Sequence, residues 1–410
     1  MTAPAPQTLE AADAPRPIRV MVVDDSVMVR GIVSRWLSEE KGVEVVATHA
    51  NGQLAANDVQ KAQPDVIVLD LEMPGMDGLT ALPLLLERRP GVSVLVASAL
   101  TRRGAEVSLK ALTLGAADYL PKPDASKGMA AADEFRRELT TKVRSLGTRI
   151  LKRSQPRAPI GPAAAPATPA AAPAPVPAAP PPAAEKATAS AAPAPLPLRN
   201  RQADARPDKL KPYSMTPPAI LAIGSSTGGP QALTRLFGDI GRSIGNLPTV
   251  VVQHMPATFT AILAEHISRA AGRPAREGVD GQVLEPGHIY VAPGGFHMVL
   301  EKQGKDTVIR IQDTEPVNFC KPAVDPMFRT VAEIYGRATL AMVLTGMGSD
   351  GANGARLITG AGGSVIAQDE ESSVVWGMPG AVVAAGACSE ILPIGEIGKK
   401  VTRILTGGRA

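Results

Sequence analysis

A serine in a glycine-rich turn is the first feature of this 410-residue sequence that could do covalent chemistry. Residues 224–228, GSSTG, follow an apolar run and precede a helical pattern, which is the strand–turn–helix setting of a G-x-S-x-G nucleophile elbow. The glycines permit a sharp turn that exposes the Ser226 hydroxyl and aims a helix N-terminus at developing negative charge. Such a turn could equally bind a phosphate, so at this point a serine nucleophile and a phosphate site are equally good interpretations.

A serine nucleophile needs a general base and a group that orients this base. Among five histidines, His254 in VVVQHMP stands at the carboxyl end of an expected strand that could neighbour the strand before Ser226. Asp350, in AMVLTGMGSDGA, lies on a glycine-rich loop after another strand, where it could orient the imidazole or cap the next helix. The three would form a triad in the chain order Ser…His…Asp. In an ordinary α/β-hydrolase the acid precedes the histidine, so this order argues against that fold.

A second group of reactive side chains lies near the N-terminus. Asp24 and Asp25 end one apolar run, and Asp70 ends another within LDLEMPGMDG. Parallel strands bring such ends together at a topological switch point, where converging carboxylates would hold a hard cation such as Mg²⁺. Ser98 and Lys122 end two further runs and would hold the extra oxygens of an acyl phosphate on Asp70. Strand-end aspartates can also simply cap helices, but five matching residues at strand ends exceed what capping requires.

Two segments of alternating strand and helix patterns must position these residues. In the first, apolar runs alternate with helical periods, the runs at 18–23, 43–48, 65–70, 92–98 and 118–120 and the helices at 27–39, 52–62, 79–88, 103–114 and 133–152. In the second, the runs lie at 219–224, 248–255, 288–293, 339–346 and 363–368 and the helices at 230–239, 258–271, 324–336 and 351–361. Residues 296–313 have the pattern of a hairpin. Each segment is therefore predicted to be an α/β domain with a doubly wound parallel sheet. For the first we expect the common flavodoxin-like strand order.

The segment between these domains differs in kind. Residues 153–217 hold 17 prolines and no hydrophobic period, so they cannot bury enough surface to offset the entropy of ordering. They carry eight Lys and Arg against three Asp and Glu. The chain's net charge of +4 therefore belongs to a linker and not to a nucleic-acid-binding face. We expect a disordered tail at 1–17, domains at 18–152 and 218–407, and a disordered Pro/Ala-rich linker at 153–217.

The motifs VVDDS, LDLEMPGMDG and GAADYLPKP resemble those of a response-regulator receiver domain. The resemblance covers about residues 18–150 and implies a regulatory switch rather than an effector. The site residues that it implies are Asp70 as the phosphate acceptor, Asp24, Asp25, Asp70 and the backbone carbonyl of Glu72 as Mg²⁺ ligands, and Ser98, Tyr119 and Lys122 as switch residues. It also implies a cis peptide bond between Lys122 and Pro123.

The motifs GSSTGGPQAL, VVQHMP, VAPGG, VDPMF and LTGMGSDGA are similar to those of chemotaxis protein-glutamate methylesterases, the CheB family. This resemblance covers about residues 217–405. It implies hydrolysis of γ-glutamyl methyl esters on chemoreceptor helices with release of methanol, and deamidation of receptor glutamines at the same site. It further implies the backbone N–H of Met347 as the oxyanion donor, with that of Thr227 as a weaker candidate, and no cofactor for the hydrolase reaction.

The resemblance also implies partners and a mode of control. Methyl-accepting chemoreceptors would be the substrates, a histidine kinase of the CheA type would be the phosphodonor, and the unphosphorylated receiver domain would cover the active site. A linker of about 65 residues is longer than usual in the family and would weaken that cover. The alternatives that stay open are a response regulator with a non-catalytic binding output, a generic esterase, and a methylesterase that serves a pathway other than chemotaxis.

Several bulk features bear on where the protein works. The sequence has no run of about 18 apolar residues, so no membrane span is predicted. The first residues lack the charged and apolar regions of a signal peptide. Cys320 and Cys388 have no metal-ligand spacing and suggest buried apolar thiols without a disulfide. These features favour a reduced, cytoplasmic location. The α/β pattern of the second domain argues against a helix-turn-helix that binds DNA.

Overall fold

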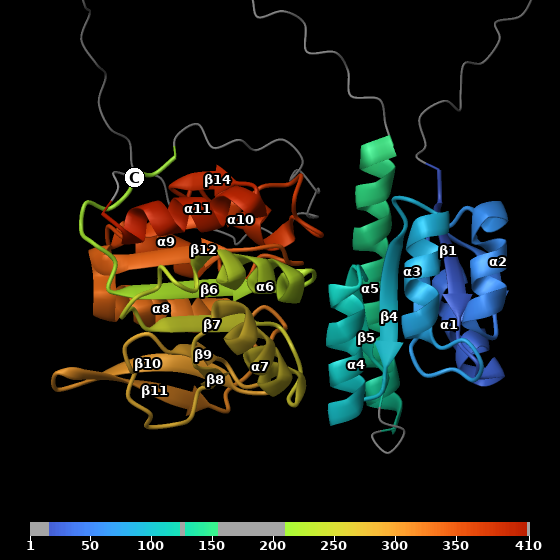
Figure 1. Cartoon of the computed structure of the whole chain (residues 1–410), viewed down its shortest axis with the longest axis horizontal. Coiled ribbons are helices and arrows are strands. Elements are labelled where there is room, and N and C mark those ends of the chain that lie inside the picture. The colour runs from blue at the N-terminus through green and yellow to red at the C-terminus, as the bar shows by residue number, and fades with distance from the viewer. Residues whose placement is uncertain (1–15, 124–127, 155–209, 408–410) are drawn as a thin grey trace, which may run out of the picture.

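The computed structural model describes residues 16–123, 128–154 and 210–407, which form two α/β domains (Figure 1). We refer to them as the N-terminal domain, up to residue 154, and the C-terminal domain, from residue 210. Most of the tail expected at 1–17 and most of the linker expected at 153–217 lie outside the described residues.

The N-terminal domain has a five-stranded parallel sheet in the order β2-β1-β3-β4-β5. Its strands are β1 (Ile18–Val23), β2 (Val43–His49), β3 (Val66–Asp70), β4 (Ser93–Ser98) and β5 (Asp118–Pro121), and its helices are α1 (Val27–Ser38), α2 (Gly52–Ala62), α3 (Gly78–Arg88), α4 (Arg102–Thr113) and α5 (Gly128–Ser154). Val20 and Val22 of β1 pack in the core made with α1 and α5, while Met21 and Val23 pack in the core made with α2, α3 and α4. Burial on both faces explains why the inner strands β1, β3 and β4 are nearly continuous apolar runs. The edge strand β2 is only partly buried and carries Glu44. The flavodoxin-like order is confirmed.

The C-terminal domain has a seven-stranded parallel sheet in the order β14-β13-β12-β6-β7-β9-β8 and a separate hairpin. Its strands are β6 (Ile220–Ser225), β7 (Thr249–Gln253), β8 (Ala275–Glu277), β9 (Ile289–Val291), β12 (Thr339–Val343), β13 (Ser364–Gln368) and β14 (Glu390–Leu392), with β10 (His297–Gln303) and β11 (Asp306–Gln312) forming the hairpin. Its helices are α6 (Gly229–Ile240), α7 (Phe259–Ala271), α8 (Val324–Tyr335), α9 (Ala352–Gly360), α10 (Gly377–Ala384) and α11 (Ile394–Leu405), with a short 3₁₀ turn at Gly336–Ala338. Helices α6, α7 and α11 cover one face, and α8, α9 and α10 cover the other.

Four elements of this domain were not predicted. Strands β8 and β14 have three residues each, too few to show an alternation. Helix α10, GMPGAVVA, is apolar on nearly every side, so it carries no 3.6-residue period. Helix α11 does carry one, with Ile394, Ile397 and Val401 buried along one stripe, and this signal would have predicted it.

Two local expectations differ from the structure. Residues 210–217, expected in the linker, lie against the C-terminal domain, where the Lys211 N–H donates to the Cys388 carbonyl and the Tyr213 hydroxyl donates to Glu390. The predicted cis bond at Lys122–Pro123 is wrong, since that bond is trans and the cis bond in the described chain is Lys321–Pro322. With a trans bond, Lys122 still continues the β4–β5 ladder through its N–H to the Ser98 carbonyl. Among the described residues, no helix has the length and apolarity needed to cross a membrane.

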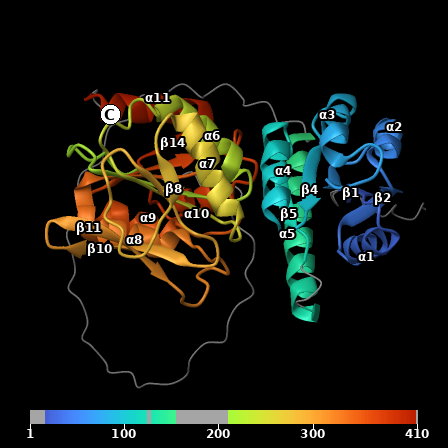
Figure 2. The ribbon, with the colours of Figure 1, turned by 60° about the horizontal axis from the view of Figure 1, so that its bottom comes forward.

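The two domains contact each other through the α4 and α5 side of the N-terminal domain (Figures 1 and 2). Helix α4 packs against α6 and α7. The rings of Tyr119 and Phe259 stack at 4.8 Å between centroids, and the Gln231 side-chain amide donates to the Ala116 carbonyl at 2.6 Å. Ser145 of α5 donates to the sulfur of Met347 at 3.3 Å. The N-terminal domain is thus docked beside the loop that holds Met347.

Candidate active site

Ser226 lies in the turn between β6 and α6, as predicted. Its N–H donates to the Thr345 carbonyl at 3.0 Å, and its carbonyl accepts from the Gly229 N–H at 2.7 Å. Gly228 has φ of 75°, and a Cβ there would lie 2.5 Å from the side chain of Val374. The turn therefore requires glycine at this position. It leaves the Ser226 side chain partly exposed at the edge of the sheet.

His254 follows β7, the strand that pairs with β6. The strand register sets Ser225 opposite Gln253, and the His254 N–H donates to the Ser225 carbonyl at 3.1 Å. Ser226 and His254 therefore follow neighbouring strand ends. His254 Nε2 and Asp350 Oδ2 lie 2.8 Å apart, and Asp350 comes from the loop after β12, which pairs with β6 on its other side. Three adjacent parallel strands bring the three predicted residues to one edge of the sheet.

The Asp350 carboxylate caps a different helix from the one expected. It accepts hydrogen bonds from the N–H groups of Val324 at 2.5 Å and Asp325 at 3.1 Å, at the start of α8. Asp325 in turn accepts from the Gly354 N–H at 2.7 Å, in the first turn of α9. Asp350, which lies just before α9, thus caps α8, and Asp325, which lies in α8, caps α9. This exchange fixes the Asp350 carboxylate against His254.

Cys320 is not the buried apolar thiol that the sequence suggests. It is half-buried, and its Sγ lies 3.4 Å from Nδ1 of His254, the ring nitrogen that does not bond Asp350. Within the described part of the chain, no hydrogen bond joins Ser226 Oγ to His254. The Cys320 thiol therefore lies against Nδ1 of His254, the atom that would have to accept the proton of a nucleophile. Cys388, by contrast, is buried as expected.

The electrostatics of this pair describe a resting site. Burial by itself lowers the pKa of His254, but the hydrogen bonds to Asp350 and Cys320 outweigh it and raise that pKa to about 9. Burial pushes the pKa of Asp350 upward, but His254 and the α8 N–H groups more than offset it, so this pKa lies below its ordinary value. Near neutral pH the pair is a carboxylate and an imidazolium. An imidazolium cannot accept the Ser226 proton.

Removal of the Cys320 thiol is expected to make His254 a base at lower pH. Cys320 raises the pKa of His254, so Cys320→Ala lowers it, and the acid limb of the pH profile of kcat/KM moves to lower pH because it follows deprotonation of the base. Initial rates of ester hydrolysis between about pH 6 and pH 10 measure this limb. Cys388→Ala removes the other cysteine, in the core of the C-terminal domain, and should leave the limb in place. Equal limbs in both variants would contradict the expectation.

Two backbone N–H groups near Ser226 can act as oxyanion donors. Among the described residues, neither the Thr227 nor the Met347 N–H donates to an acceptor. Thr227 is part of the nucleophile turn. Met347 follows Gly346, where a Cβ would lie 2.9 Å from the Ser226 Cβ. That close approach is what brings the Met347 loop to the nucleophile.

The predicted carboxylate cluster of the N-terminal domain is present at the ends of β1 and β3. Asp24, Asp25 and Asp70 each offer an oxygen, and these oxygens all lie within 4.8 Å of one another. Lys122 Nζ lies 2.7 Å from Asp70 and 3.0 Å from Asp24. Burial raises the pKa of Asp70, Lys122 opposes this shift and Asp24 adds to it, with a net rise above the ordinary value. The Glu72 N–H donates to Asp70 at 3.2 Å, so Glu72 also lies at the cluster.

The side chains of the two remaining switch candidates make their described contacts with residues other than the carboxylates. Ser98 Oγ is buried and lies 2.5 Å from Ser108 Oγ, so its hydroxyl bonds α4 and not Asp70. Tyr119 is buried against Phe259 of the other domain, and burial raises its pKa well above the ordinary value. The Tyr119 ring therefore belongs to the domain contact.

Three side chains that support the two sites were not predicted from the sequence. Gln253 accepts from the Ser225 hydroxyl at 2.7 Å and donates to the Ser226 carbonyl at 2.9 Å, so it braces the nucleophile turn. Asn318 donates to Asp350 at 3.1 Å. Lys142 pairs with Asp118 beside Tyr119. Gln253 ends a buried strand directly before His254, a position that would have marked it; the other two carry no sequence signal.

Comparisons with known proteins match the two domains that hold these residues. A family model described as CheB methylesterase matches residues 221–401, and one described as response regulator receiver domain matches residues 20–133. A curated relative from Rhodopseudomonas palustris, named protein-glutamate methylesterase/protein-glutamine glutaminase of group 2 operon, is 50% identical over 96% of this chain and 96% of its own length. A relative of the same name from Bradyrhizobium diazoefficiens is 49% identical over 96% of each chain.

Two solved structures each resemble one domain. The CheB methylesterase catalytic domain of Thermotoga maritima is 39% identical, with a TM-score of 0.44, and the match covers 46% of this chain and 100% of that one. The response regulator domain of Thermotoga maritima CheB is 34% identical, with a TM-score of 0.29, over 32% of this chain and 95% of that one. Because curated relatives about half identical span nearly the whole sequence, the chain belongs to the CheB family of protein-glutamate methylesterases/protein-glutamine glutaminases with a receiver domain.

Proposed function

We propose that this chain is a phosphorylation-controlled serine hydrolase that demethylates glutamate methyl esters on chemoreceptors and deamidates receptor glutamines. The observation that carries the proposal is the His254–Asp350 pair, 2.8 Å apart, at the strand ends beside Ser226. Relatives about half identical are named for both activities. An ester and a primary amide each present a carbonyl carbon to the same nucleophile, so one site serves both.

In the proposed reaction, Ser226 Oγ attacks the ester carbonyl carbon while His254 takes the hydroxyl proton. Nε2–H of His254 is bonded to Asp350, so the proton-accepting atom is Nδ1, which faces Cys320 in the resting geometry. Asp350 holds the ring orientation and stabilises the imidazolium that forms. His254 then protonates the leaving group, which departs as methanol from an ester or ammonia from an amide. A water molecule, deprotonated by His254, attacks the acyl-enzyme carbonyl carbon and breaks its ester bond to Ser226. The receptor's glutamate side chain leaves as a carboxylic acid, and His254 returns the proton to Ser226 Oγ.

The tetrahedral intermediates place a negative charge on the former carbonyl oxygen. The unpaired N–H groups of Met347 and Thr227 would stabilise this charge, and the loss of one such donor typically lowers turnover by about 10²–10³-fold. Met347 is also the residue that α5 contacts through Ser145. Control by the receiver domain therefore has a direct route to the oxyanion site.

Asp70 is the proposed phosphate acceptor, with a histidine kinase as donor. The cluster fits Mg²⁺, because its donors are carboxylate oxygens close enough to share one ion. Asp24, Asp25, Asp70 and the Glu72 carbonyl would hold the ion, which would neutralise charge on the phosphoryl group. Lys122, now bonded to both Asp24 and Asp70, would pair with the new phosphoryl oxygens.

The docked domain arrangement supports an inhibited unphosphorylated state. The contact joins Tyr119 to Phe259, Gln231 to Ala116 and Ser145 to Met347. Tyr119 lies in β5, the strand next to β4, and Lys122 lies three residues further on. A change at Lys122 on phosphorylation is therefore transmitted through β5 to the Tyr119 contact. The length of the linker does not prevent docking, because the contact itself holds the domains together.

Methanol release from a methylated chemoreceptor fragment tests the proposal. Hydrolysis should be slow with the full chain alone and faster with acetyl phosphate, a small phosphodonor. Ammonia release from receptor glutamines should respond in the same way. Small lipophilic esters serve as the comparison substrate. If they were turned over faster than methylated receptor, the chain would be a general esterase and the proposed substrate would be wrong.

Asp70→Asn is expected to abolish activation by acetyl phosphate while it leaves basal hydrolysis unchanged. The amide cannot form the acyl phosphate, yet it keeps a similar shape at the end of β3. Methanol release with and without acetyl phosphate measures the activation ratio, which should fall to about one. Asp77→Asn is a matched control, because Asp77 caps α3 and lies outside the carboxylate cluster. Activation that persists in Asp70→Asn would show that another residue accepts the phosphate.

A further inference from the structure

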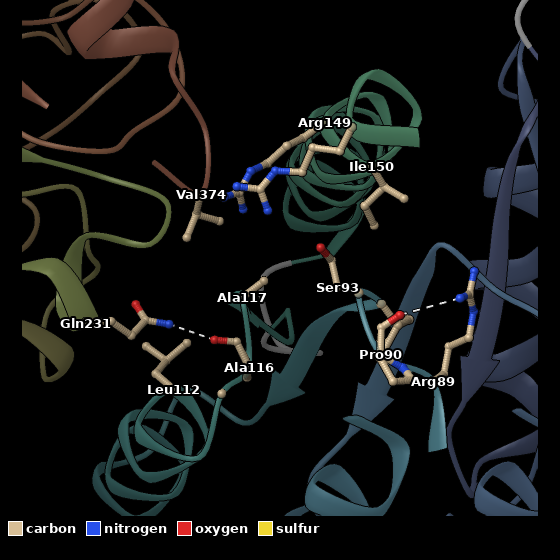
Figure 3. Close-up of a pocket in the computed structure, with 14 residues that line it drawn as sticks. Arg89, Pro90, Ser93, Leu112, Ala116, Ala117, Arg149, Ile150, Gln231 and Val374 are labelled. Carbon is tan, nitrogen blue, oxygen red and sulfur yellow. Dashed lines mark hydrogen bonds between the residues drawn. The ribbon is translucent and has the colours of Figure 1, made fainter. Parts of the chain in front are cut away.

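A cavity of about 480 Å³ lies between the two domains, and its lining includes none of the residues placed in the two sites above. Its N-terminal walls come from the start of β4, the loop before β5 and the end of α5, and its C-terminal walls come from α6 and from Val374 (Figure 3). Arg149 projects from α5 toward Val374, and Gln231 enters from α6 (Figure 3). This volume is within the range of about 300–1,000 Å³ that is usual for small-molecule sites.

Two arginines of α5 give the cavity an uncompensated positive charge. Arg149 and Arg153 both donate to the Glu371 backbone carbonyl, at 3.4 and 2.6 Å. In the part of the chain that the structure describes, neither forms an ion pair, although Lys152 between them pairs with Glu370 at 3.6 Å. The Nε atom of Arg149 is buried and has no hydrogen-bond partner among those residues. Burial and the charge of Arg153 lower the pKa of Arg149 to about 10.

The opposite wall carries an unpaired acceptor. The Gln231 amide nitrogen donates to the Ala116 carbonyl at 2.6 Å, which fixes the orientation of the amide because a flipped group would set two oxygens against each other. The Gln231 Oε1 atom is then buried with no partner in the described residues. A buried donor or acceptor left without a partner typically costs about 1–3 kcal/mol. Leu112, Ile150 and Val374 supply apolar surface between the two polar ends.

We propose that this cavity binds a phosphorylated small molecule of mononucleotide size. The phosphate would lie at Arg149 and Arg153, whose planar guanidinium groups suit a tetrahedral oxyanion. An N–H or O–H group of the ligand would donate to Gln231 Oε1, and its apolar part would lie between Leu112 and Val374. The contacts to Arg149 Nε and to Gln231 Oε1 would satisfy the two buried atoms of this cavity that have no partner among the described residues. This proposal rests on the docked arrangement and not on the hydrolase chemistry.

Such a ligand would act as an inhibitor, because the two polar ends of its site belong to different domains. It binds only when the domains are docked, so by linkage it favours the docked state. Linkage is reciprocal. If the ligand opposes the release of the domain contact by phosphorylation of Asp70, then phosphorylation must weaken ligand binding by the factor by which the ligand opposes that release. The concentration of a phosphorylated metabolite would then determine what fraction of the phosphorylated molecules is open and active.

Titration calorimetry on the full chain tests the proposal. The probes are AMP, GMP, CMP and UMP, with adenosine and inorganic phosphate as controls. At least one nucleotide should bind with Kd below about 1 mM, and adenosine should not bind. Binding of none of the four nucleotides would overturn the proposal. Equal affinity for inorganic phosphate would overturn the claim about ligand size.

Variants of α5 locate the site. Arg149→Gln should weaken binding at least about tenfold, since the phosphate contact is charge-assisted. Arg144→Gln removes the same charge from the same helix outside the cavity, at a residue that bonds Glu40 and Lys41 of its own domain, and should leave Kd unchanged. Arg149→Lys keeps the charge but loses the buried Nε, so it should also weaken binding, while Arg153 keeps its bond to the Glu371 carbonyl across the domain contact. Unchanged affinity in both Arg149 variants would overturn the proposed site. Because binding is measured directly, the result does not depend on hydrolase activity.

Discussion

Replacement of Ser226 with alanine is expected to lower methanol release from methylated receptor by about 10⁴–10⁶-fold, the range seen when a triad nucleophile is removed. The residual rate would come from the oxyanion donors and from binding alone. The turn itself should survive, because its hydrogen bonds run from the backbone N–H and carbonyl of residue 226 to Thr345 and Gly229. Ser226→Ala should therefore bind receptor as wild type does and fail only in kcat.

The neighbouring serine provides a matched control. Ser225 has the same chemistry, but its hydroxyl is buried and donates to Gln253 at 2.7 Å. Ser225→Ala loses this bond and should lower stability by about 1 kcal/mol, with activity within about tenfold of wild type. A Ser226→Ala enzyme that kept more than about a tenth of the wild-type kcat would rule out Ser226 as the nucleophile.

The sequence was informative wherever function lies at the end of a parallel strand. Ser226, His254 and Asp350 each follow a buried apolar run, and adjacent parallel strands must end at the same edge. The three residues are far apart in the sequence, but the sheet topology places them at the ends of neighbouring strands. The same reasoning placed Asp24 and Asp70 together. In each case a short local pattern determined the position in three dimensions.

It was uninformative where position depends on loop conformation or on the other domain. Cys320 and Asn318 lie in a loop between β11 and α8, and Asn318 has a left-handed backbone with φ of 52°, which no local pattern predicts. The bond from Ser98 to Ser108 and the stacking of Tyr119 on Phe259 depend on tertiary packing. The exchange of caps between Asp325 and Asp350 likewise requires two helices from distant segments to meet.

Two separate features of the structure describe the same resting state. His254 has a raised pKa of about 9 with Cys320 at Nδ1, so the base is protonated near neutral pH. Independently, α5 contacts Met347 at the oxyanion loop. Under the proposed function, activation would therefore have two requirements: the receiver domain must leave Met347, and the Cys320 loop must leave His254. A substrate helix that enters the cleared site could provide the second movement.

Tyr119→Ala is expected to raise the activity of the unphosphorylated full chain by up to about tenfold. The stacked pair with Phe259 contributes about 0.5–1.5 kcal/mol beyond its buried area, and 1.4 kcal/mol corresponds to about a tenfold change in an equilibrium constant. Removal of the ring therefore shifts the balance from docked toward open molecules. Methanol release without phosphodonor measures the gain, and acetyl phosphate should then add less than it does to wild type.

Tyr119→Phe separates the ring from the hydroxyl. It keeps the stacking on Phe259 at the same position and should retain the low basal activity of wild type. If both variants gained activity equally, the hydroxyl and not the ring would hold the domains together. If Tyr119→Ala stayed at the wild-type basal rate, the contact between β5 and α7 would not restrain the hydrolase. Inhibition would then have to act through Ser145 and Met347 alone, because theirs is the contact that reaches the oxyanion loop.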